Sequence, residues 1–257
     1  MLWRHFLLRE AESMGNNAEV VEPGPSKAGL WEDFVDIFYA PSSVFARRAD
    51  GKFGLALLFL IVATVILVFL TKNAMQPIMD AEFVRQGAAA MRKNPNITQD
   101  QLASSRNFFE MVAPFFFGIG LTISVFGTGL VLWLVSKLFD AKTSVAAAIM
   151  IATYSEVPRI VQILVNAAQA LFMSPERLNA INSVGFNPAR FMDPDHASAV
   201  AIALASRFDL FVIWITVLLA IGIYVVGKVT KQQAAIIAVI VWVLGALPGV
   251  LSALRNA

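Results

Sequence analysis

The stretch that decides the fold is residues 143–172, which read TSVAAAIMIATYSEVPRIVQILVNAAQALF. It is apolar enough to cross a bilayer, yet Glu156 and Arg159 stand at its middle with Pro158 between them. Spaced at helical intervals, Ser155, Arg159, Gln162, Asn166 and Gln169 fall on one face. Lipid cannot cover such a face, so other segments must wrap around this one. The sequence therefore predicts a membrane protein with several spans.

A candidate intramembrane polar network follows from this face: Ser155, Glu156, Arg159, Gln162, Asn166 and Gln169. Two interpretations stay open. In the first, Glu156 and Arg159 pair across one helical turn, the carbonyl of Tyr154 accepts a further bond from Arg159, and the amides bond to neighbouring helices. In the second, the face lines a wet path for an ion or a solute. We favour the structural interpretation, because the pattern is one charge pair plus amides.

The composition supports a membrane class. The chain has 257 residues, of which 58% are hydrophobic and 15% charged, and the apolar residues gather in uncharged runs. A formal net charge of +2 gives no reason to expect a nucleic-acid partner. The chain has no cysteine and only two histidines, and it carries no nucleotide-binding or hydrolase motif. We therefore expect no enzyme activity, no catalytic residue, no cofactor and no metal site.

Five uncharged or nearly uncharged runs predict five transmembrane helices, at residues 53–71, 111–136, 143–172, 210–227 and 232–254. The third run would be about 45 Å long as a straight helix, against a hydrocarbon core of about 30 Å. We expect it to break or kink at Pro158. The predicted fold is an all-α bundle of five spans, within one membrane domain over residues 30–257.

The residues before the first span divide into two parts. Residues 1–29 are polar and contain prolines and glycines, which predicts a disordered cytoplasmic tail. From Leu30 an amphipathic helix is predicted, with Trp31, Phe34 and Phe38 on its apolar face and Asp33 away from it. Pro41 is expected to end it. This helix either lies in the membrane interface or packs against the ends of the spans.

The loops predict the topology. Basic residues cluster before the first span, at Arg47, Arg48 and Lys52, and in the two short loops between spans two and three and between spans four and five. The positive-inside rule then puts the N-terminus in the cytoplasm and the C-terminus outside. The two long outer loops, residues 72–110 and 174–209, contain helical segments at 78–93 and 196–207. Thr98 and Gln101 have the spacing of a capping box for a helix leading into span two.

Gly245 and Gly249 form a small-xxx-small pair in the fifth span, with Pro248 between them. Such pairs let two helices approach closely. We interpret this one as a packing motif within the bundle, and consider a homodimer contact less favoured.

Three segments carry a family resemblance. Phe38-Tyr39-Ala40-Pro41 precedes span one, and Ala152-Thr153-Tyr154-Ser155-Glu156-Val157-Pro158 lies in span three. Phe208-Asp209-Leu210-Phe211-Val212-Ile213-Trp214 opens span four, which continues to Gly222. Over residues 34–254 the chain resembles a bacterial member of the Yip1 family of five-span membrane proteins. The positions that carry the match are Pro41, Pro158, Asp209, Trp214 and Gly222.

The resemblance implies a five-helix fold in the cytoplasmic membrane of a bacterium. Eukaryotic members of the family are membrane organisers that bind small GTPases. Their GTPase-binding region is not matched here, so no small GTPase is expected as a partner. We expect a non-catalytic organiser or adaptor whose partners are membrane lipid and other membrane proteins or a second copy of itself. The alternative is a small permease or channel that uses the polar face of span three.

Overall fold

The computed structural model describes residues 29–256, and within that range every regular element is a helix. The predicted disordered tail, residues 1–29, lies outside the described residues except for Gly29, and stays a prediction. Within residues 29–256, five helical segments are long and apolar enough to cross a membrane. The predicted all-α, five-span bundle is therefore confirmed.

The spans are built from seven helices: α4 Gly54–Lys93, α5 Gln99–Lys137, α6 Val145–Ser155, α7 Pro158–Phe172, α9 Leu210–Gly227, α10 Lys231–Leu244 and α11 Leu247–Asn256. Two short helices precede them, α2 Leu30–Asp36 and α3 Pro41–Arg47. Between α7 and α9 lie η1 Pro175–Arg177, η2 Ile181–Ser183, η3 Pro188–Phe191 and α8 Ala199–Ser206. The helix predicted at 196–207 is thus shorter at both ends.

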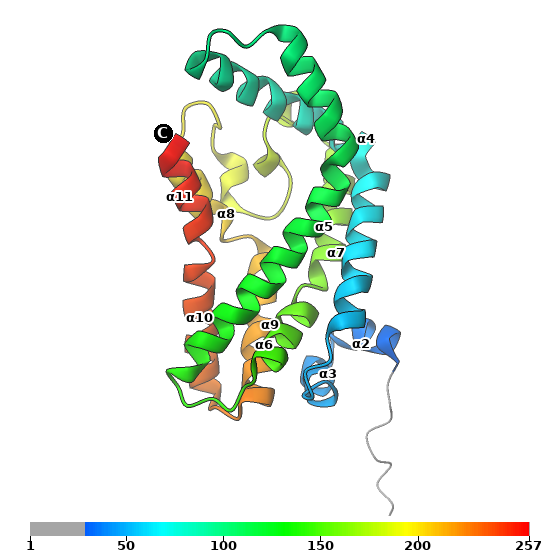
Figure 1. Ribbon diagram of the computed structural model, residues 1–257, viewed down its shortest axis with the longest axis vertical. Helices are drawn as coiled ribbons and strands as arrows, with labels where there is room; N and C mark the ends of the chain where they lie inside the picture. The colour runs from blue at the N-terminus through cyan, green and yellow to red at the C-terminus, as the bar shows by residue number, and fades with distance from the viewer. Residues whose placement is uncertain (1–28, 257) are drawn as a thin grey trace, which may run out of the picture.

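Helix α4 corrects the predicted end of the first span. Instead of one span ending at residue 71 and a separate helix at 78–93, a single helix of 40 residues runs through Pro77. A proline removes one backbone hydrogen bond and bends a helix without always ending it. Figure 1 shows the consequence, because the second half of α4 turns away from the bundle axis and lies across its upper end.

Two other spans are interrupted. The third span breaks between α6 and α7, as predicted, because Pro158 has no N–H to donate to the turn before it. The fifth, predicted as one run over 232–254, breaks between Leu244 and Leu247, just before Pro248.

Pro41 does not end α2 but opens α3, where a proline in the first turn loses no helical hydrogen bond.

Span three lies at the centre of the bundle. Of its most apolar window 61% is buried, against 22% to 39% in the other four spans. Helices α5 and α9 approach it closely through glycines. A Cβ on Gly129 would stand 2.8 Å from the Cα of Ile149, and a Cβ on Gly222 would clash with the side chain of Ile151. The central position agrees with the argument that other segments must wrap this span.

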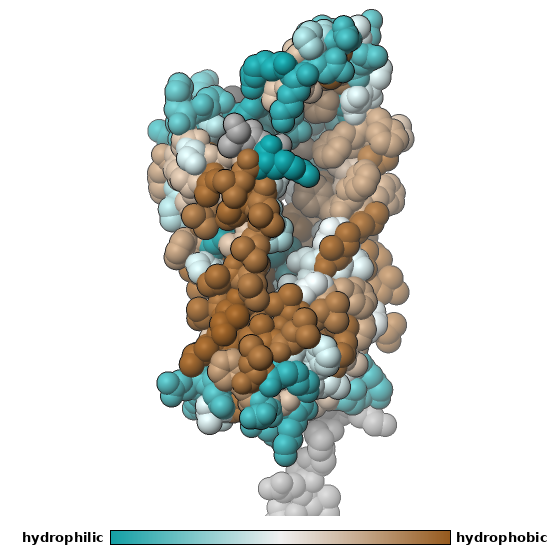
Figure 2. Space-filling model, turned by 60° about the vertical axis from the view of Figure 1, so that its left-hand side comes forward, coloured by the Kyte–Doolittle hydropathy of each residue, from teal (hydrophilic) through white to brown (hydrophobic). Residues whose placement is uncertain are grey.

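The described chain starts and finishes at opposite ends of the bundle (Figure 1). Helices α2 and α3 lie at the same end of the bundle as the two short loops that carry lysines, one between α5 and α6 and one between α9 and α10. These two loops are in contact, because the Lys142 N–H donates to the Gly227 carbonyl at 3.0 Å. Figure 2 shows hydrophobic residues in a band around the middle and hydrophilic residues at both ends, as a bilayer requires.

Candidate functional site

The break between α6 and α7 begins a chain of polar contacts. The Arg159 Nε donates to the Glu156 carboxylate at 2.5 Å, and Arg159 Nη1 donates to Gln162 Oε1 at 3.2 Å. The Gln162 Nε2 then donates to Asp209 Oδ1 at 3.1 Å. The Glu156 side chain is 5% exposed and that of Arg159 is 35% exposed. The pair therefore has a buried anion and a cation that is partly open.

One detail of the expected network is wrong. No hydrogen bond joins Arg159 to the Tyr154 carbonyl, which accepts from the Val157 N–H at 3.3 Å in the tight turn at the helix break. Gln162 supplies the acceptor for Arg159 instead, one turn further along α7.

Asp209 ties span four to the loop between α7 and α9 and to α7 itself. It is 4% exposed and caps α9, accepting from the Phe211 N–H at 2.9 Å. Its other oxygen accepts from the Phe186 N–H at 3.1 Å, across the loop that precedes the helix. An anion at a helix N-terminus is stabilised by the unpaired N–H groups there. Asp209 therefore holds three elements together with one carboxylate.

The six residues of the predicted polar network do not form one continuous set. Glu156, Arg159 and Gln162 join directly, whereas Gln169 accepts from the Gly185 N–H at 3.0 Å in the outer loop. Ser155 Oγ and Asn166 Oδ1 are buried and have no hydrogen-bond partner among the described residues. The face is about 21 Å long from residue 155 to residue 169, so its members meet different neighbours.

Arg207, which sequence reasoning did not single out, contacts the fifth span just before its break between α10 and α11. Its Nη2 donates to the Trp242 carbonyl at 2.8 Å, and the Trp242 Nε1 donates back to the Arg207 carbonyl at 3.2 Å. Burial lowers the pKa of Arg207, with the charge of Arg159 as a second cause. A Cβ on Gly245 would meet Nη2 at 3.0 Å, and one on Gly249 would meet Ala203 of α8 at 3.9 Å. The glycine pair thus faces the α8 region.

A second charged cluster lies at the other end of the bundle. Asp33 is fully buried, and its carboxylate pairs with Arg47 at 2.8 Å and with Arg48 at 2.5 Å. Tyr154 Oη of span three donates to it at 3.5 Å. Arg47 also bonds Asp36, and this bond lowers the pKa of Asp36. The prediction that Asp33 lies away from the buried face is wrong, because two arginines from α3 allow it to turn inward.

The family-like positions have structural roles. Pro41 and Pro158 each open a helix, and Gly222 lies against Ile151 of α6. The Trp214 ring packs edge-on against Phe38 at 5.4 Å, which joins α9 to the segment between α2 and α3. Among residues 29–256, no three His, Asp or Glu side chains are grouped to hold a metal ion.

The comparison with known families agrees with this arrangement. The family model described as the Yip1 domain matches residues 35–252, which is most of the chain. The chain belongs to the Yip1 family. No curated protein and no solved structure matches it. Yip1 proteins are generally a non-enzymatic membrane family, and the five apolar spans agree with a membrane location.

Proposed function

We propose that this Yip1 protein is a non-catalytic membrane organiser or adaptor, which binds other membrane proteins or shapes the bilayer. The observation that carries the proposal is the platform formed by α2 and α3. The buried Asp33 joins α2 to α3 through Arg47, and the Tyr154 hydroxyl of span three donates to it, while Trp31 is 68% exposed and Tyr39 is 70% exposed. Aromatic side chains of this kind bind at membrane interfaces and at protein contacts.

The proposed setting is the cytoplasmic membrane of a bacterium, with the platform in the cytoplasm and the C-terminus outside. The basic residues near the platform support this orientation. Arg47 and Arg48 belong to it, and the short loops beside it carry Lys142 and Lys228. Positive charge in short loops favours the cytoplasmic side.

Site-specific photocrosslinking in cells tests the proposal. A photoreactive phenylalanine analogue replaces Tyr39, and in a matched variant it replaces Phe191, which is 85% exposed at the opposite end. We expect adducts from position 39 with lipid, with a membrane protein or with a second copy, at a higher yield than from position 191. Absence of all three adducts at position 39 would contradict the proposal.

A small permease or channel is the second candidate, and two observations favour it. Arg159 is 35% exposed although it lies inside span three, and Asn166 Oδ1 has no partner among the described residues. A wet site would have both properties. Liposomes containing the full chain and a panel of ions and solutes separate the candidates. Flux that the Arg159→Gln substitution abolishes would support the permease. Flux no greater than that of empty liposomes would leave the organiser as the remaining candidate.

A further inference from the structure

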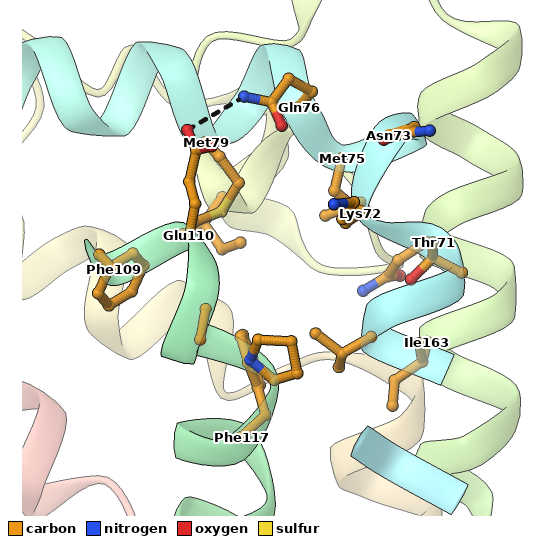
Figure 3. A pocket seen from close by; sticks show the side chains of 15 residues that line it. Thr71, Lys72, Asn73, Met75, Gln76, Met79, Phe109, Glu110, Phe117 and Ile163 are labelled. Carbon is orange, nitrogen blue, oxygen red and sulfur yellow. Dashed lines mark hydrogen bonds between the residues drawn. The ribbon is translucent and has the colours of Figure 1, made fainter. Parts of the chain in front are cut away.

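A cavity of about 460 Å³ lies between α4, α5 and α7, and η2 closes one side. Its volume is in the range of about 300–1,000 Å³ that ligand sites have. Figure 3 shows that the side chains of Lys72, Asn73 and Gln76 gather on the upper side, and those of Phe117 and Ile163 on the lower side. The upper side therefore carries the charged and amide side chains together with Met75 and Met79, and the lower side is mainly apolar.

The upper side lies at the depth of lipid headgroups. Lys72 is the first charged residue after Lys52, and it follows the apolar run of α4. Glu110 is the last charged residue before the apolar run of α5. Both line the cavity. Since charges at the ends of apolar runs mark the boundary between hydrocarbon and water, the cavity crosses that boundary.

Prolines in both long helices open the space. Pro77 cannot donate to the carbonyl of Asn73, and Pro114 cannot donate to that of Glu110. Asn73 and Glu110 both line the cavity, as does Pro114 itself. The bend of α4 and the proline of α5 therefore face each other across it.

Two side chains show what a ligand must offer. Lys72 forms no ion pair with any described residue, and its Nζ lies 5.2 Å from the centre of the Phe69 ring. An anion would complement it. Glu110 accepts from Arg106 at 2.7 Å and from Gln76 at 3.4 Å, and both donors also serve Asp80, so the two carboxylates share one guanidinium. A donor, best of all a cationic one, would complement this side.

We propose that the cavity binds one phospholipid whose headgroup carries both a phosphate and an ammonium with N–H donors, as in phosphatidylethanolamine. The phosphate pairs with Lys72 and Asn73, and the ammonium bonds Glu110. The first carbons of the acyl chains lie along Phe117 and Ile163. This assigns a defined lipid site, which goes beyond the organiser role and does not depend on it.

Phosphatidylcholine provides the matched ligand, because it has the same net charge and the same phosphate but no N–H. The full chain is delipidated in detergent, and palmitoyl-oleoyl phosphatidylethanolamine or phosphatidylcholine is titrated in. Native mass spectrometry then measures the first binding event. Losing one hydrogen bond to a charged group lowers affinity about tenfold, so we expect phosphatidylethanolamine to bind about tenfold more tightly. Equal affinities would overturn the proposal.

Three variants locate the site. Lys72→Gln should weaken both lipids, because both carry the phosphate. Glu110→Gln should reduce the preference for phosphatidylethanolamine over phosphatidylcholine. Lys93→Gln, at the far end of α4 and outside the cavity, should change neither. An equal loss in Lys72→Gln and Lys93→Gln would mean nonspecific charge attraction and overturn the site. Circular dichroism confirms that each variant remains helical, and the crosslinking at Tyr39 tests the organiser role separately.

Discussion

The two halves of span three differ sharply in how they are packed. Nine residues of α6, Ala147 to Ser155, are buried, whereas α7 buries only Pro158, Ala167 and Ala170. The α6 half is made of small and apolar side chains that glycines of α5 and α9 contact directly. The α7 half carries polar side chains, contacts with the loop between α7 and α9, and one wall of the cavity. One transmembrane segment thus joins a close-packed end to an open end, and the proposed lipid site lies at the open end.

The charged clusters follow the same division. At the α6 end, the anion Asp33 is fully buried and two arginines serve it. At the α7 end, a single arginine serves Glu156 and is itself partly exposed. Burial makes an unpaired charge costly, while access to water reduces that cost. The difference therefore predicts unequal effects of the same kind of substitution at the two ends.

The largest effect is expected at the α6 end. Arg47→Gln with Arg48→Gln leaves Asp33 buried and without its cationic partners, which should lower the free energy of unfolding by about 3–5 kcal/mol. Adding Asp33→Asn should recover most of the loss. Thermal unfolding in detergent measures both. Lys52→Gln is the control, because its side chain is 81% exposed. A double variant as stable as this control would mean that the cluster does not hold the platform.

The pair at the α7 end should respond asymmetrically. Arg159→Gln leaves the buried Glu156 unpaired and should cost about 2–3 kcal/mol, below the range for a fully buried pair because the site is partly open. Glu156→Gln leaves Arg159, whose side chain is 35% exposed, with its bond to Gln162, and should cost about 1 kcal/mol. The double substitution should cost less than Arg159→Gln alone. Equal losses in the two single variants, or additive losses in the double variant, would show that the α7 end is as dry as the α6 end.

Glycines on one helix sharpen the packing comparison. Gly129→Ala places a methyl group against the backbone of Ile149, and overpacking of this kind costs about 1–3 kcal/mol. Gly127→Ala, two residues earlier on α5, has nothing within 4 Å and should be neutral or slightly stabilising. The detergent melting temperatures of the two variants provide the measurement. Similar losses in both would argue against close packing at the α6 half.

The smallest effect is expected from pH in the outer loops. The pKa of His196 is raised above 6.5, first by its hydrogen bond with Asp193 and then by the charge of that residue. A raised folded pKa means that this contribution to stability is fully present below 6.5 and is lost as pH rises through the folded pKa. The melting temperature should fall slightly over that interval, and His196→Gln should remove the slope. If the melting temperature of His196→Gln falls by the same amount over this interval, the fall belongs to another titratable group.

Sequence reasoning was most accurate where local rules decide the structure. The bounds 210–227 of α9 follow from an aspartate cap and an uninterrupted apolar run, and the capping box at Thr98 begins α5 as expected. It failed at Asp33, because the arginines that permit burial are 14 and 15 residues away. The cavity was also out of reach, since its walls come from three helices distant in sequence.

The central place of span three has a consequence for how the chain enters the membrane. This span is the least apolar of the five, and each buried charge at mid-membrane costs about 2.5–3.5 kcal/mol on insertion. It is synthesised after the α4–α5 hairpin but before α9, which supplies Asp209. The nascent segment must therefore rely on the hairpin and on the Glu156–Arg159 pair until the fourth span arrives. Biogenesis, as well as the final structure, then requires the first two spans to be in place before the third partitions into lipid.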